Sequence, residues 1–172
     1  MKWKMIGLLL LSGIFGFAIG IGIKFVYEAT AFKPYTWGDK SPIIVNCYGE
    51  DFSEVQFVRA VHYWTIRGHN IGFYEHNPPD SICERDGYIE GFIVLRKAEG
   101  GELSSPTLAV TKRWTSFDKL RGAVIKYRPG TQNLSWINEH ELGHALGYAH
   151  VEEDGHIMHP LQHKMAGKFW IP

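Results

Sequence analysis

The sequence has no excess of either charge and no run of basic residues. Its 172 residues include 18 that are basic and 18 that are acidic, so nucleic acid is not expected as a partner. No internal repeat and no low-complexity segment is present, which excludes repeat architectures and a disordered chain. The length suits a single domain that is large enough to bury a core of its own.

Cysteine is scarce, with only Cys47 and Cys83 in the whole chain. Two thiols cannot build a structural zinc site by themselves, and their spacing matches no zinc-ribbon pattern. In an oxidising compartment they could form a disulfide bond. Otherwise they would be buried thiols that behave as small apolar side chains, and the sequence leaves both alternatives open.

One long stretch near the N-terminus has no charged residue at all. It covers residues 5–23, and Lys2 and Lys4 precede it. A helix of that length rises about 28 Å, close to the hydrocarbon thickness of a bilayer. The sequence therefore predicts a lipid bilayer as partner and a single-pass membrane protein with the rest of the chain outside the cytoplasm. The alternative is secretion after cleavage near Ala31.

Hydropathy and turn residues divide the chain into three parts. Residues 1–24 are the predicted membrane anchor or signal segment, residues 25–42 are predicted to be a stalk, and residues 43–172 form the predicted folded domain. Strands are expected at 42–48, 70–75, 88–95, 107–112 and 122–127, and helices from Ser53 to about Arg67 and from Asn133 or Ser135 onward. This alternation favours a layered α/β domain.

The first of these helices is predicted by the residue types at its start. Ser53 and Gln56 form a capping box, in which each side chain can bond a free backbone N–H of the first turn. Val55, Val58, Val61 and Thr65 recur at helical spacing, so we expect them to face a sheet.

A cluster of histidines in the second helix indicates a metal centre. The segment 140–150 reads H-E-x-x-H-x-x-G-x-x-H. His140 and His144 lie on one face of a helix, so both can reach one metal ion, and Glu141 is offset enough to reach a water bound there. Gly147 is expected to end the helix in a left-handed turn that brings His150 to the same ion. Three imidazoles leave a fourth position for water, which is typical of one catalytic Zn²⁺ ion.

Other donors follow the motif and could compete to be the third ligand. They are Asp154, His156, His159 and His163.

Together with the segment Ile157-Met158-His159-Pro160, the histidine motif resembles that of the metzincin clan of zinc metallopeptidases. In that clan a methionine-containing turn lies beneath the metal, here Met158, and the M-x-P ending is similar to the matrixin branch. The resemblance implies a zincin-like α/β fold: a twisted, mostly parallel five-stranded sheet with one antiparallel edge strand, and helices above and below it. Only 14 residues follow Met158, so the C-terminal subdomain should be short.

The resemblance also implies a function. Zinc would activate a water molecule, Glu141 would act as general base, and the chain would be an endopeptidase acting on peptide or protein substrates. The edge strand would line the cleft, which makes Leu108, Ala109 and Val110 candidates for substrate contact. Two alternatives remain: a membrane-tethered, zinc-containing binding module without turnover, and a hydrolase of non-protein amides.

Overall fold

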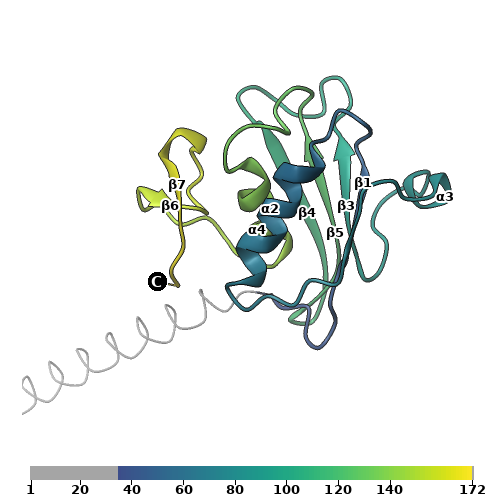
Figure 1. Ribbon diagram of the computed structural model, residues 1–172, viewed down its shortest axis with the longest axis horizontal. Helices are drawn as coiled ribbons and strands as arrows, with labels where there is room; N and C mark the ends of the chain where they lie inside the picture. Colours follow the sequence, from purple (N-terminus) through teal and green to yellow (C-terminus); the bar gives the residue numbers. More distant parts are fainter. Residues whose placement is uncertain (1–34, 172) are drawn as a thin grey trace, which may run out of the picture. The chain divides into compact units, whose positions relative to one another are not determined.

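The computed structural model describes residues 35–171 of the chain (Figure 1). The uncharged segment 5–23 and the cleavage site near Ala31 lie outside these residues, so the membrane and secretion hypotheses stay predictions. Within residues 35–171 no helix is both long and apolar enough to cross a bilayer.

A five-stranded sheet forms the centre of the domain, with its strands in the order β2-β1-β3-β5-β4 (Figure 1). The strands are β1 (Ile43–Cys47), β2 (Tyr74–Glu75), β3 (Phe92–Lys97), β4 (Ala109–Ser116) and β5 (Lys119–Tyr127). All pairings are parallel except that of β4, which runs antiparallel to β5 at one edge of the sheet. The predicted fold class is therefore confirmed.

Two helices, α2 (Glu54–Thr65) and α4 (Ile137–Ala145), pack against each other and share one apolar core with the sheet (Figure 1). The expectation of helices above and below the sheet was wrong. The large apolar side chains of the strands, such as Ile44, Ile93 and Ile125, belong to the core beneath both helices. The other face has a small separate cluster around Val45, Val94 and Val124. It is covered in part by Ile82 of the short helix α3 (Asp80–Cys83) and needs no long helix.

The orientation of α2 also differs from the prediction. Ser53 caps it as expected, because its Oγ accepts a hydrogen bond from the backbone N–H of Gln56. However, Val55 and Val58 are 81% and 47% exposed, whereas Phe57, Ala60 and Trp64 are fully buried. The larger aromatic surfaces release more free energy on burial than valines, so they determine which face of the helix meets the core.

The second helix, α4, begins later than predicted. Its N-cap is Trp136, with a positive φ of 66°, and not Asn133 or Ser135. After α4 the chain forms a small subdomain with a 3-10 turn (Gln162–Lys164) and two short strands, β6 (Gly155–His156) and β7 (Met165–Lys168). The described residues after Met158 contain no α-helix, which matches the expected short C-terminal subdomain.

Two further features join distant parts of the chain. Cys47 and Cys83 form a disulfide bond that links the end of β1 to α3, the kind of bond that forms in oxidising compartments. Residues 35–42, which the sequence assigns to the stalk, lie against the domain. Trp37 is buried there and donates a hydrogen bond from its Nε1 to the carbonyl oxygen of Ala145, and Thr36 bridges to Lys119.

Candidate active site

Helix α4 presents His140 and His144 to a cleft while its other side is fixed in the core. Leu142 and Leu146 are buried in the main core cluster. The two histidines, one turn apart, come out on the opposite side, as positions four apart on a helix must. The apolar side chains therefore set the height and rotation of the two rings.

Each of these rings is oriented by a backbone carbonyl. Nδ1 of His140 lies 2.9 Å from the carbonyl oxygen of Ile157, and Nδ1 of His144 lies 2.8 Å from that of Tyr148. A carbonyl oxygen only accepts, so both Nδ1 atoms must carry the proton. Burial lowers the pKa of His140 to about 4 and that of His144 to about 3, which keeps both rings neutral. Their Nε2 atoms therefore present bare lone pairs.

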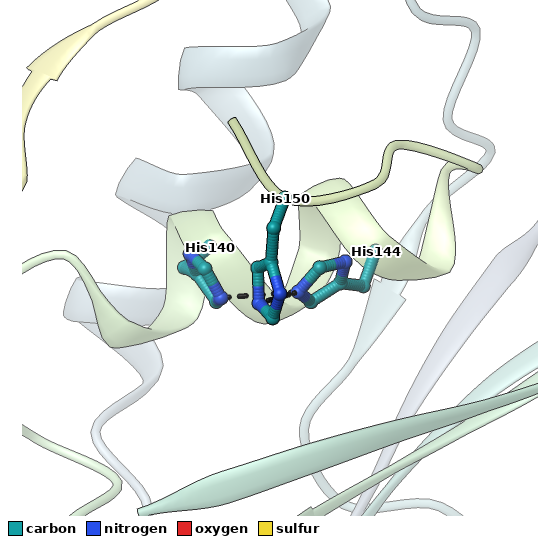
Figure 2. A group of neighbouring side chains, drawn as sticks. All are labelled: His140, His144 and His150. Atoms are coloured by element: carbon teal, nitrogen blue, oxygen red, sulfur yellow. Dashed lines mark hydrogen bonds between the residues drawn. The ribbon is translucent and has the colours of Figure 1, made fainter. Parts of the chain in front are cut away.

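The Nε2 atoms of the three motif histidines converge on one point (Figure 2). Nε2 of His144 lies 3.0 Å from Nε2 of His140 and 3.1 Å from Nε2 of His150. Because His140 and His144 both direct lone pairs there, their contact cannot be a hydrogen bond and would be repulsive without a cation between them. Three nitrogens each about 2.0–2.1 Å from a tetrahedral zinc ion would lie about 3.3 Å apart. The residues present thus fit zinc, and no fourth His, Cys, Asp or Glu of the described residues joins the group.

The third histidine reaches the cluster because the chain turns sharply after α4. Gly147 has a φ of 113°, a conformation that side chains other than glycine's rarely adopt. A β-carbon at Gly147 would also overlap the backbone oxygen of Tyr35, so the position needs glycine for space as well. His150 itself is exposed on the loop that follows.

Met158 lies in a fully buried position under α4. Its sulfur occupies the space where a β-carbon of Gly143 would be, and Trp64 fills the other side of that space. The turn also supplies the Ile157 carbonyl that orients His140. This explains in packing terms why a glycine stands between the two helical histidines, a role that the sequence pattern did not reveal.

Glu141 is only 4% exposed and lies next to the edge strand. Thr111 of β4 has its Oγ1 2.6 Å from Oε2 of the Glu141 carboxylate. Burial raises the pKa of Glu141 to about 7, and the hydrogen bond from Thr111 acts in the opposite direction. Sequence reasoning missed Thr111, because nothing local marks a threonine that meets a helix 30 positions later.

The histidines and Glu141 line a cleft of about 940 Å³. Leu108, Ala109 and Val110 lie along one side of it. The carbonyl oxygen of Leu108 already accepts hydrogen bonds from the Arg128 backbone N–H and the Thr131 hydroxyl. Any contact of Leu108 with a peptide would therefore use its N–H or its side chain.

The competing donors do not join the cluster. His156 is buried, with Nδ1 accepting from the N–H of Met158 and Nε2 lying 3.0 Å from the oxygen of Trp170. His159 accepts from the N–H of Leu161 and faces Asp154. Asp154 pairs with Lys164 at the surface, and His163 is exposed at the cleft wall.

Comparison with known proteins gives one family. The family model described as Matrixin (Peptidase_M10) matches residues 49–171, which is well over half of the chain and includes every residue of the site. A search of curated proteins finds no match.

Proposed function

Because this chain belongs to the matrixin family, whose members are zinc-dependent peptidases, we propose that it is an endopeptidase in which Glu141 is the general base. The observation that supports this most directly is the convergence of three imidazole nitrogens beside a buried carboxylate in an open cleft. Three protein ligands leave one coordination position for water, the arrangement found in catalytic and not in structural zinc sites.

We assign the metal to His140, His144 and His150. The chemistry that zinc supplies at such a site is Lewis acidity, which makes water more acidic and a carbonyl group more electrophilic. The carbonyls of Ile157 and Tyr148 hold the first two rings in the tautomer that directs Nε2 to the metal. Met158 supports the helix from below through its contact with the Gly143 backbone.

Glu141 is the residue that handles protons in this proposal. Its carboxylate lies one position from a ligand histidine and lines the same cleft. It would take a proton from the attacking water and deliver it to the leaving amine. Because burial raises its pKa toward neutrality, the carboxylate is a stronger base than an exposed glutamate.

Cleavage within a chain, in contrast to cleavage at its ends, is supported by the edge strand. The side of the cleft formed by β4 and its approach runs from Pro106 to Arg113, and its strand part, from Ala109 to Arg113, corresponds to roughly 13 Å of extended chain. The outer edge of β4 has no strand beside it among the described residues. An extended peptide could pair there and continue past the histidines in both directions, with Leu108, Ala109 and Val110 as its neighbours.

The test uses the full chain, its zinc content and its turnover of casein or gelatin with and without a chelator. Glu141→Ala should keep zinc near one equivalent but lower kcat by at least a hundredfold, as expected when a general base is removed. Glu152→Ala, an exposed acid on the loop after the third histidine, is the matched control and should retain activity.

Three results would contradict the assignment. A wild-type chain that binds zinc without cleaving any peptide would favour the binding-module alternative. Cleavage of non-protein amides alone would favour the other one. Undiminished turnover by Glu141→Ala would exclude Glu141 as the base.

A further inference from the structure

The carboxylate of Glu141 is held by a hydroxyl group from the neighbouring strand. Oγ1 of Thr111 lies 2.6 Å from Oε2 of Glu141 and 3.1 Å from the Glu141 backbone oxygen. The shorter distance is typical of a hydroxyl that donates to an ionised carboxylate, one of the stronger protein hydrogen bonds. Glu141 is buried, so water competes little for this bond.

The two oxygens of the carboxylate are in different environments. Oε2 accepts from Thr111, whereas Oε1 has no protein hydrogen-bond partner among residues 35–171. Some polar side-chain atoms among residues 35–171 are fully enclosed and lack a hydrogen-bond partner, such as Oε2 of Glu139. Oε1 of Glu141 is not among these atoms, so it is not fully enclosed. Since Glu141 lines the cleft, Oε1 is the oxygen that reaches it.

From this division we propose that Thr111 is a positioning residue, whose hydroxyl fixes Oε2 so that Oε1 faces the metal centre. The proposal deepens the proposed function and depends on it. A glutamate side chain has three torsions, and the last of them is broad. Without an anchor on Oε2 the carboxylate would sample orientations in which neither oxygen points at the reacting water, which lowers the rate of the step but not the binding of peptide.

The same face of β4 contacts the far end of the ligand segment. Arg113, two residues after Thr111, directs its guanidinium toward the carbonyl oxygens of His144 at 3.3 Å and Tyr148 at 3.4 Å. Alternate residues of a strand share a face, so one row of β4 side chains touches both the base and the backbone around the second ligand. The strand along which a peptide would pair is thus in direct contact with Glu141, the proposed general base.

The experiment compares Thr111→Val, which has nearly the same shape but no hydroxyl, with Thr111→Ser, which restores the hydroxyl. Thr115→Val is the matched control, because Thr115 is an exposed threonine of the same strand outside the cleft. For the zinc-loaded full chain we expect Thr111→Val to lower kcat on the order of 10- to 100-fold with KM within about twofold, as for loss of a bond to a charged group. Thr111→Ser should recover most of the rate, and Thr115→Val should match the wild type.

A second measurement is independent of turnover. Crystal structures of the wild type and Thr111→Val should show the carboxylate anchored in the first and displaced or in several orientations in the second. An unchanged carboxylate position, or an unchanged kcat, would overturn the proposal. Equal losses in Thr111→Ser, or loss of zinc from Thr111→Val, would overturn it in favour of a purely structural role. A wild type without peptidase activity would contradict the proposed function, and the crystal comparison alone would then decide the role of Thr111.

Discussion

The three proposed metal ligands are held in two different ways, two of them by a helix and one by a loop. His140 and His144 belong to α4, where each residue except His144 is buried and both rings donate a hydrogen bond from Nδ1 to a carbonyl. His150 belongs to the exposed loop that follows Gly147. No residue among 35–171 forms a hydrogen bond with its Nδ1. In the proposed zinc site, α4 would therefore fix the position of the ion and the loop would complete its coordination.

The contacts that hold helix α4 in place also differ from those that hold the loop after Gly147. α4 is fixed from its other side by Trp64, whose Nε1 donates to the carbonyl oxygen of Glu139 at 2.7 Å, and by the pair of Arg59 with the buried Glu139 carboxylate. The loop is held by Tyr148, which stacks on Trp64 with ring centroids 5.1 Å apart. The hydroxyl of Tyr148 lies 2.8 Å from Nε2 of His69. The loop therefore depends on a few contacts, whereas α4 is enclosed by the core.

The largest expected effect is a loss of zinc affinity that is greater for a helix histidine than for the loop histidine. We expect His144→Ala to weaken zinc binding by more than a hundredfold, since even the loss of a residue that only orients a ligand costs 10- to 100-fold. His150→Ala should also weaken it, but less, because a water molecule can enter the exposed position more easily than the buried one. Competition of zinc between each variant and a fluorescent chelator measures both constants.

His163→Ala serves as the control, because His163 is exposed at the same cleft but lies outside the histidine cluster. Its zinc affinity should equal that of the wild type. Equal losses in His144→Ala and His150→Ala would show that helix and loop contribute alike, and full zinc retention in His150→Ala would place the third ligand elsewhere.

A second prediction tests how tightly α4 is packed. Gly143→Ala would gain about 1 kcal/mol from better helix propensity. The new methyl group, however, would overlap Met158 and Trp64, which are both fully buried and cannot move freely. We expect a net loss of about 1–2 kcal/mol in the free energy of unfolding, measured by urea denaturation, since overpacking costs about 1–3 kcal/mol.

Gly100→Ala is the matched control for this substitution. A β-carbon at Gly100 would meet no atom within 4 Å, so the change should alter the stability by less than about 0.5 kcal/mol. Equal stability of Gly143→Ala and the wild type would show that the turn containing Met158 can move away from α4, and the core would then enclose this helix less firmly than its burial indicates.

The helix was far easier to predict from the sequence than its surroundings. Spacing alone placed His140, His144 and Glu141 on one helix, because helical periodicity is a local property. The antiparallel edge strand was implied by the resemblance to the metzincin clan and not by spacing, and the short subdomain was predicted from the few residues that follow Met158. The boundaries were less accurate, since β4 ends at Ser116 and not near Lys112, and α4 starts at Ile137.

What could not be predicted depends on contacts between distant segments. Thr111 meets Glu141 only because β4 lies at the edge next to α4, and no pattern within either segment encodes that contact. The face of α2 that carries Val55, Val58, Val61 and Thr65 was predicted to be the buried one. Of these only Val61 packs against the core, whereas Phe57 and Trp64 are fully buried. Counting apolar positions treats valine and tryptophan as equal, whereas the area that each buries differs greatly.

The smallest expected effect concerns the attachment of the loop at mildly acidic pH. Burial lowers the pKa of His69 below its usual value of 6.5. Between the lowered pKa and 6.5 the unfolded chain binds more protons at this position than the folded one. The stability that neutral His69 provides is therefore complete above pH 6.5 and is lost as the pH falls from there toward the lowered pKa.

His69→Gln should reduce this loss, because glutamine does not titrate yet can still bond the Tyr148 hydroxyl. Urea unfolding with zinc in excess, at pH values between 7 and 5, measures the slope for both proteins, and His62→Gln on the exposed side of α2 is the control. A smaller slope in His69→Gln alone would locate the acid sensitivity at the contact that holds the loop. Parallel slopes in all three proteins would show that His69 protonates without loosening that contact, and the loop would then need a support other than the bond between His69 and Tyr148.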